Sequence, residues 1–212
     1  MTMARCAPAR PADRGFTLVE VLVALGIMAT LAVMGWQGID GIVRTRDASQ
    51  ARLEQTLRLN TVIAQWDQDL ASLQDGGVMR PTFLTCDGST VRMTRRTPAG
   101  LQIVAWSFRP DDSGGAWVRW AGPSVTSVGE LQDSWLRSQQ LQGSERGSLK
   151  TLTGLSGWQV YFYQTNGWAN CQTSGNVSNG KTLPPSGVRV VLSFAAGGGV
   201  IGDLTRDTWL GP

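Results

Sequence analysis

The sequence predicts an α+β fold in which a long N-terminal helix packs on an antiparallel β-sheet. Residues 16–76 contain no proline and carry apolar side chains, first continuously and then at helical spacing. After residue 77 the pattern changes to short β-branched or aromatic runs separated by turn residues. The 212 residues are enough for one globular domain with an appendage.

The first part of the helix is predicted to lie in a membrane. Residues 16–36 form an apolar run of 21 residues with one charge, Glu20, and about 20 helical residues cross a hydrocarbon core roughly 30 Å thick. A secretory signal peptide usually has a shorter apolar run, of about 7–15 residues, that ends at a small-residue cleavage site. Since no such site follows here, a membrane segment is the better interpretation.

The helix is predicted to continue beyond the membrane segment. From Ile39 to Leu73, apolar residues recur at spacings of mostly three and four, with polar and charged residues between them. Such spacing is typical of one apolar stripe on a helix. Gly76 and Gly77 supply a stop signal. Residues 39–76 are therefore expected to form an amphipathic continuation that packs on the globular body.

The body is predicted to consist mainly of strands joined in hairpins. Five short runs have strand character: Thr90–Thr94, Leu101–Phe108, Ala116–Ala121, Trp158–Tyr163 and Val188–Phe194. The segment Gly129–Leu141 fits either a short helix or an extended crossover, and Gly143–Gly147 has loop composition. The segment Asn166–Pro185, rich in Asn, Gly, Ser and Thr, is expected to be an exposed loop.

The composition excludes several classes of enzyme site. The chain contains no histidine, which rules out Ser-His-Asp and Cys-His nucleophilic sites, His-ligated metals and imidazole acid–base chemistry. We therefore expect a protein that is not an enzyme and that needs no cofactor.

A metal site or a nucleic-acid interface is not expected either. The closest acidic groups lack the alternating spacing of a calcium loop. They are Asp67/Asp69, Asp111/Asp112 and Asp203/Asp207. The 19 Lys and Arg residues give a formal net charge of +3, but they are scattered, and Arg95 and Arg96 are the only two in direct succession. A compact basic surface for DNA or RNA is therefore not predicted.

The nine tryptophans allow two interpretations. Five of them could stack on a sugar or peptide ligand: Trp106, Trp117, Trp120, Trp158 and Trp168. However, Trp66, Trp106, Trp117 and Trp158 each stand in a periodic helix or strand pattern. That context favours packing between helix and sheet, and in subunit contacts, over ligand binding.

Glu20 is the one charged residue in the apolar segment. A carboxylate in a bilayer is costly unless it pairs with a cation or serves a function, and the segment contains no Lys or Arg. An α-amino group released by proteolysis nearby would be a suitable partner. The string Gly15–Phe16–Thr17–Leu18–Val19–Glu20, after a short basic leader and before an apolar helix, resembles the prepilin cleavage and methylation signature. This signature is shared by type IV pilins and by the pseudopilins of type II secretion.

The resemblance implies how the N-terminus is processed and used. A prepilin peptidase would cut between Gly15 and Phe16 and methylate the new amine of Phe16. Removal of the leader, residues 1–15, would lower the formal net charge from +3 to +1. Glu20 would pair with the terminal amine of a neighbouring subunit during assembly. Either charge alone is penalised in a low dielectric, whereas the two attract strongly.

The resemblance also implies a pilin-like domain organisation. Residues 16–38 would be the transmembrane and fibre-core helix, residues 39–76 its amphipathic continuation, and residues 77–212 a periplasmic β-rich domain. The chain would be a single-pass inner-membrane protein of a bacterium, with the leader cytoplasmic and the C-terminal domain periplasmic. Arginines flank both ends of the apolar segment, so this orientation depends on the resemblance and not on charge.

The body is similar to the J-type minor pseudopilins of type II secretion. The similarity is carried by Val104–Trp106, Trp117–Trp120, Leu136–Leu141 and Gly157–Tyr163. It implies a structural subunit of a hetero-oligomeric tip complex with I-type and K-type minor pseudopilins, which starts a short fibre that helps to export folded proteins across the outer membrane. Glu20 argues against the K type, which typically lacks it. The alternative is a minor pilin, such as the W type, of a type IV pilus assembly or a DNA-uptake system, because such pilins share every N-terminal feature.

Leader removal would also change the number of cysteines. Cys6 would leave with the leader, so Cys86 and Cys171 would remain as a pair in an oxidising periplasm. A disulfide between them is predicted if the fold brings their Cα atoms within roughly 4.4–6.8 Å.

Overall fold

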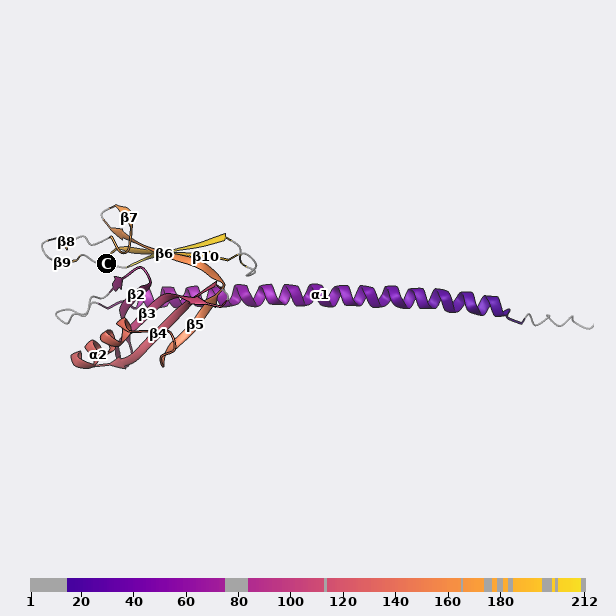
Figure 1. Cartoon of the computed structure of the whole chain (residues 1–212), viewed down its shortest axis with the longest axis horizontal. Coiled ribbons are helices and arrows are strands. Elements are labelled where there is room, and N and C mark those ends of the chain that lie inside the picture. Colours follow the sequence, from indigo (N-terminus) through magenta and orange to yellow (C-terminus); the bar gives the residue numbers. More distant parts are fainter. Residues whose placement is uncertain are drawn as a thin grey trace, which may run out of the picture. The chain divides into compact units, whose positions relative to one another are not determined.

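The structure of the protein is a computed structural model (Figure 1). It describes residues 15–74, 84–112, 114–164, 166–173, 177–178, 181–182, 185–195, 200 and 202–210. The chain forms two compact units that divide between Ala51 and Arg52. Helix α1 (Leu18–Ala71) contributes to both units.

In the first unit, α1 carries its apolar side chains on the surface. Large hydrophobic residues from Phe16 to Val43 are exposed, and the first buried residue of α1 is Val62. Within the described part of the chain, α1 is the one helix long and apolar enough to cross a membrane. An apolar run with no protein around it is what a bilayer or neighbouring helices would cover.

The C-terminal end of α1 is set by a strand. After Ala71 the backbone turns and pairs with β2 (Thr90–Thr97), because the amide of Arg96 donates to the carbonyl of Ser72 at 2.8 Å and the amide of Gln74 donates to that of Thr94 at 3.0 Å. The helix therefore ends before the Gly76–Gly77 stop, and those glycines lie outside the described residues.

The body contains two larger antiparallel sheets and one small hairpin. The first sheet has the order β1-β2-β3-β4-β5 and the second β11-β10-β6-β7. The other strands of the first sheet are β1 (Leu84–Cys86), β3 (Gly100–Asp111), β4 (Gly114–Val125) and β5 (Ser148–Thr153). Those of the second are β6 (Leu155–Gln164), β7 (Gly167–Asn170), β10 (Gly187–Phe194) and β11 (Gly202–Trp209). β8 (Val177–Ser178) and β9 (Lys181–Thr182) form the hairpin.

The α+β architecture is confirmed, with some differences in its elements. The five predicted strands lie in β2, β3, β4, β6 and β10. The segment 129–141, left open between helix and crossover, forms helix α2 (Val128–Gln139), which Ser127 caps by accepting the amide of Glu130. The expectation of a loop over 166–185 was partly wrong, because β7, β8 and β9 form there. The sequence prediction also missed β1, β5 and β11.

The main core lies where α1 meets both sheets. Val62, Trp66 and Leu70 supply the buried apolar face of α1. They belong to one cluster with side chains from both sheets, including Trp106 and Trp117 of the first and Val188, Val190 and Leu192 of the second. The ring centroids of Trp66 and Trp106 are 5.6 Å apart in a T-shaped arrangement, a preferred geometry for aromatic pairs. Core packing is thus confirmed for Trp66, Trp106 and Trp117, which are fully buried.

A second, smaller core lies under α2. It is formed by Ile103, Ala105, Trp120, Val125, Leu131 and Leu141. Figure 1 shows α2 beside strands β3 and β4 of the first sheet. The first sheet is therefore covered by α1 in the main core and by α2 in the smaller one.

Candidate functional site

The prepilin-like motif lies at the start of α1. Gly15, Phe16 and Thr17 are not helical, and Phe16 is 83% exposed. Thr17 begins the helix, because its carbonyl accepts the amide of Glu20 at 3.1 Å and its Oγ1 lies 3.3 Å from the same amide. The Gly15–Phe16 bond therefore lies in exposed, non-helical backbone directly before the first turn.

Glu20 occupies the first turn of α1. Its carboxylate is exposed and makes no ion pair with another described residue. An acid in the first turn is favoured by the helix dipole, which accounts for part of its tolerance there. In a bilayer the same carboxylate would still need a cation.

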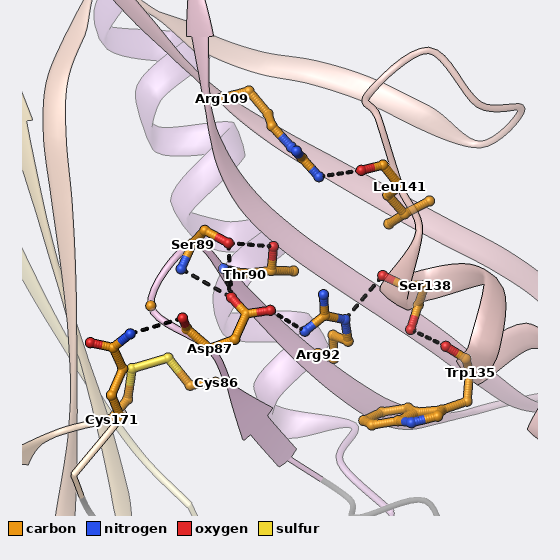
Figure 2. A network of polar contacts seen from close by, with 12 residues as sticks. Cys86, Asp87, Ser89, Thr90, Arg92, Arg109, Trp135, Ser138, Leu141 and Cys171 are labelled. Carbon is orange, nitrogen blue, oxygen red and sulfur yellow. Dashed lines mark hydrogen bonds and ion pairs between the residues drawn. A yellow bond between two sulfur atoms is a disulfide. The ribbon is translucent and has the colours of Figure 1, made fainter.

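The cysteines are brought together at the edge of the two sheets. Cys86 ends β1 and Cys171 follows β7. Their Cα atoms are 5.7 Å apart and the sulfur atoms are bonded, so the disulfide joins the first sheet to the second. Figure 2 shows it beside Asp87. The side-chain amide of Gln172 donates to the backbone carbonyl of Asp87 at 2.9 Å, which adds a second link at the same place.

Asp87 is the centre of a polar network around the β1–β2 turn (Figure 2). Its Oδ1 accepts the amide of Thr90 at 2.8 Å and the amide and hydroxyl of Ser89 at 3.0 and 2.9 Å. Its Oδ2 accepts Arg92 Nη1 at 2.6 Å. Burial alone would raise the pKa of Asp87, but the hydrogen bonds from Arg92, Ser89 and Thr90 outweigh it and hold the pKa below the ordinary value of 3.8.

Arg92 extends this network to α2. Its Nε donates to the carbonyl of Ser138 at 3.0 Å, and Arg109 donates to the carbonyl of Leu141 nearby. The carbonyl of Ser138 lies in the last turn of α2, where carbonyls have no helical partner, and Leu141 follows the C-cap residue Gln140. Cationic donors there suit the helix dipole. The network therefore holds α2 on the first sheet, which is a structural role.

A second polar centre is fully buried at Asp69 on α1. Its Oδ1 accepts Arg95 Nη1 at 2.7 Å and Gln65 Nε2 at 3.0 Å. Its Oδ2 accepts Arg119 Nε at 2.7 Å and Trp106 Nε1 at 2.8 Å. The carboxylate is 0% exposed, and its partners come from β2, β3 and β4 as well as α1. This cluster fixes α1 on the first sheet, and no motif in the sequence predicts it.

The other acidic groups considered as metal ligands mostly bind cations of the protein itself. Asp67 pairs with Arg206, Asp111 with Lys150 and Asp207 with Arg189. Hydrogen bonding from Arg189 lowers the pKa of Asp207. Among the described residues, no group of three or more Cys, Asp or Glu side chains could hold a metal ion.

Comparisons with known proteins agree with the motif and extend beyond it. A model of the prokaryotic N-terminal methylation motif matches residues 10–36. Over 174 residues, the chain is 28% identical to type II secretion system protein J of Vibrio cholerae serotype O1, and the alignment covers 73% of this chain and 72% of the relative. The motif on this helix, together with a similarity to protein J that extends well into the β-rich body, supports a J-type pseudopilin.

Proposed function

We propose that the chain is a minor pseudopilin of a type II secretion system, a structural subunit of the pseudopilus tip that helps to drive export of folded proteins across the outer membrane. The observation that carries this proposal is the extent of the similarity to protein J. It covers 73% of the chain, whereas the methylation motif covers residues 10–36 alone. The N-terminal features are common to pilins and pseudopilins. The similarity of the body to protein J therefore favours a role in secretion over that of a W-type minor pilin in a pilus.

Processing would occur at the start of α1. The proposal places cleavage between Gly15 and Phe16, with methylation of the Phe16 amine. The exposed, non-helical backbone of these residues supports it, since proteases act on chain that is free of regular structure. The leader would be cytoplasmic and the β-rich body periplasmic, with α1 as a single anchor in the inner membrane.

Assembly would depend on Glu20. The carboxylate lies in the first turn of α1 among exposed apolar side chains and has no cation among the described residues. The methylated amine of Phe16 on an adjacent subunit would supply that cation within the apolar fibre core. Breaking such a pair in a low dielectric costs about 3–5 kcal/mol, which is enough to set the axial register between subunits.

The proposed neighbours are the I-type and K-type minor pseudopilins. In this scheme the exposed surface of the body selects the neighbours, while the N-terminal half of α1 supplies the contacts of the fibre core. The chain itself would do no chemistry; its contribution would be position and shape.

Deletion of the gene in its own bacterium tests the proposal. Loss of secreted proteins from the medium, restored by the wild-type chain, is expected, and surface pili and twitching should be unaffected. Normal secretion with loss of pili would instead indicate that the chain is a minor pilin of a type IV pilus. Mass spectrometry of the mature protein should find a methylated Phe16 at its start, and a start at Met1 would contradict the processing step.

A further inference from the structure

Strand β11 presents an open edge. It is the terminal strand of the second sheet and pairs with β10 over its whole length of eight residues. At the end of this ladder the amide of Leu210 donates to the carbonyl of Ser186. Because antiparallel pairs alternate, the even-numbered residues of β11 bond to β10. The amides and carbonyls of Asp203, Thr205, Asp207 and Trp209 therefore face away from the sheet.

The other sheet edges are short or covered. β1 has three residues and β7 has four. β5 is longer, but Arg58 of α1 donates to the carbonyls of Thr151 and Lys150 at 2.9 and 3.4 Å and so occupies part of its edge. Among the described residues, no side chain donates to or accepts from the outer edge of β11. Such an uncovered edge is a template for another strand.

The charges on β11 do not oppose pairing. Charged side chains on an edge strand usually prevent the approach of another strand. Here Arg206 is neutralised by Asp67 of α1 at 2.7 Å, and Asp207 by Arg189 of β10 at 2.6 Å. Asp203 is exposed and makes no ion pair with another described residue. The edge is therefore left with one uncompensated negative charge.

An aromatic patch adjoins this edge on the outer face of the sheet. It consists of Tyr163, Trp168 and Trp209, whose ring centroids are 5.2 to 6.0 Å apart. Gly187 makes room for it, because a Cβ there would lie 3.1 Å from the Trp209 ring. Arg189 covers Trp168 at 4.3 Å, whereas Trp209 remains 64% exposed. Trp, Tyr and Arg are the residues that most often dominate protein-binding surfaces.

The geometry points to β11 as a strand-addition site for an extended segment of another protein, with a basic residue beside Asp203 and an apolar residue beside Trp209. A row of alternating amides and carbonyls is complementary to a polypeptide backbone. Asp203 and Trp209 lie on the same face, six positions apart on β11. The partner segment therefore carries its basic and apolar residues six positions apart, on one face. This inference does not depend on the proposed role in secretion.

A designed peptide tests the inference on the full chain in detergent micelles. The probe has eight residues of alternating threonine and valine, with lysine at its first and tryptophan at its seventh position. We expect binding, slower hydrogen exchange at the amides of Asp203, Thr205 and Asp207, and a change in Trp209 fluorescence. A control peptide with tryptophan at the sixth position, on the opposite face, should bind more weakly.

Two variants at one position separate the backbone contact from the side chain. Thr205→Pro removes an outward amide without breaking the bonds to β10, and proline is tolerated on edge strands with this orientation. Thr205→Pro should lower the affinity for the probe at least about tenfold. Thr205→Ala, which keeps the amide, should change the affinity less than about twofold. Equal binding by Thr205→Pro and the wild type would overturn the inference.

Charge reversal gives an independent readout if the proline variant does not fold. Asp203→Lys should lose affinity for the lysine probe and gain affinity for the same peptide with glutamate in place of lysine. No change in this preference would contradict the charge match. Slow exchange of the three amides before any peptide is added would also refute the inference. If protection of these amides from hydrogen exchange increases with protein concentration, the edge pairs with a second copy of the chain instead.

Discussion

Asp67 and Asp69 lie two positions apart on α1 and bind opposite sheets. Asp67 pairs with Arg206 of β11 at 2.7 Å and accepts the hydroxyl of Thr208 at 2.7 Å, whereas Asp69 binds Arg95 and Arg119 of the first sheet. Two positions on a helix are about 200° apart, so neighbouring acids point to opposite sides. α1 is thus held between the two sheets by polar contacts as well as by its apolar face.

Replacement of Asp69 by Asn should strongly destabilise the body. The variant leaves two guanidinium groups, 19% and 13% exposed, beside a neutral amide. Loss of one partner from a buried ion pair typically costs about 3–5 kcal/mol. Denaturant unfolding of the full chain in detergent, followed by tryptophan fluorescence, measures the change in the free energy of unfolding.

Asp67→Asn is the matched control for this prediction. It removes the same charge from the same helix, but Arg206 is 50% exposed, so the cost should be about 1 kcal/mol or less. If the two variants lose equal stability, the buried Asp69 cluster does not contribute more to the free energy of unfolding than the exposed Asp67 pair.

The helix and the central strands could be predicted because their signals are local. Trp66 and Leu70 recur at helical spacing, and the β-branched run Val188–Phe194 needs no distant residue to be recognised. The motif at Gly15, Phe16 and Glu20 is also contiguous. Such signals do not depend on which segments later lie side by side.

The missed features depend on pairing across the fold. β11 lacks an apolar alternation because its inner face carries Arg206 and Thr208, whose partner Asp67 is more than a hundred residues away. The buried position of Asp69 could not be recognised for the same reason, since its partners Arg95 and Arg119 belong to strands β2 and β4. Propensity cannot detect a strand whose polar side chains are satisfied only in the folded chain.

The Asp87 network should make stability depend on acidic pH. The pKa of Asp87 is lower in the folded chain than its ordinary value of 3.8. The contribution is therefore fully present above about pH 4 and is lost as pH falls through the folded pKa. Asp87→Asn should lower the urea midpoint at neutral pH, and the difference from the wild type should shrink at pH values below about 3. A difference that is the same at both pH values would refute the assignment.

The disulfide between Cys86 and Cys171 should stabilise the body considerably. The two residues are separated by 85 positions, and closing a loop of that length is worth about 4–5 kcal/mol in the chain-entropy model. The double variant Cys86→Ser, Cys171→Ser should therefore unfold at lower denaturant concentration. Reduced wild type should resemble it, and alkylation with and without reductant should show both thiols protected before reduction. Free thiols in the protein isolated from its own bacterium would contradict this prediction.

Neutralising Glu20 should separate processing from assembly. Glu20→Gln keeps the size and the helical preference of the side chain but removes the charge that is proposed to bind the amine of a neighbouring Phe16. Membrane insertion and leader removal should continue, because neither needs the carboxylate, whereas incorporation into the fibre should fall at least about tenfold. Cross-linking in membranes measures incorporation, and mass spectrometry measures the start of the chain. Asp47→Asn, an exposed acid on the same helix outside the apolar segment, should change neither; equal incorporation of both variants would rule out the pairing role of Glu20.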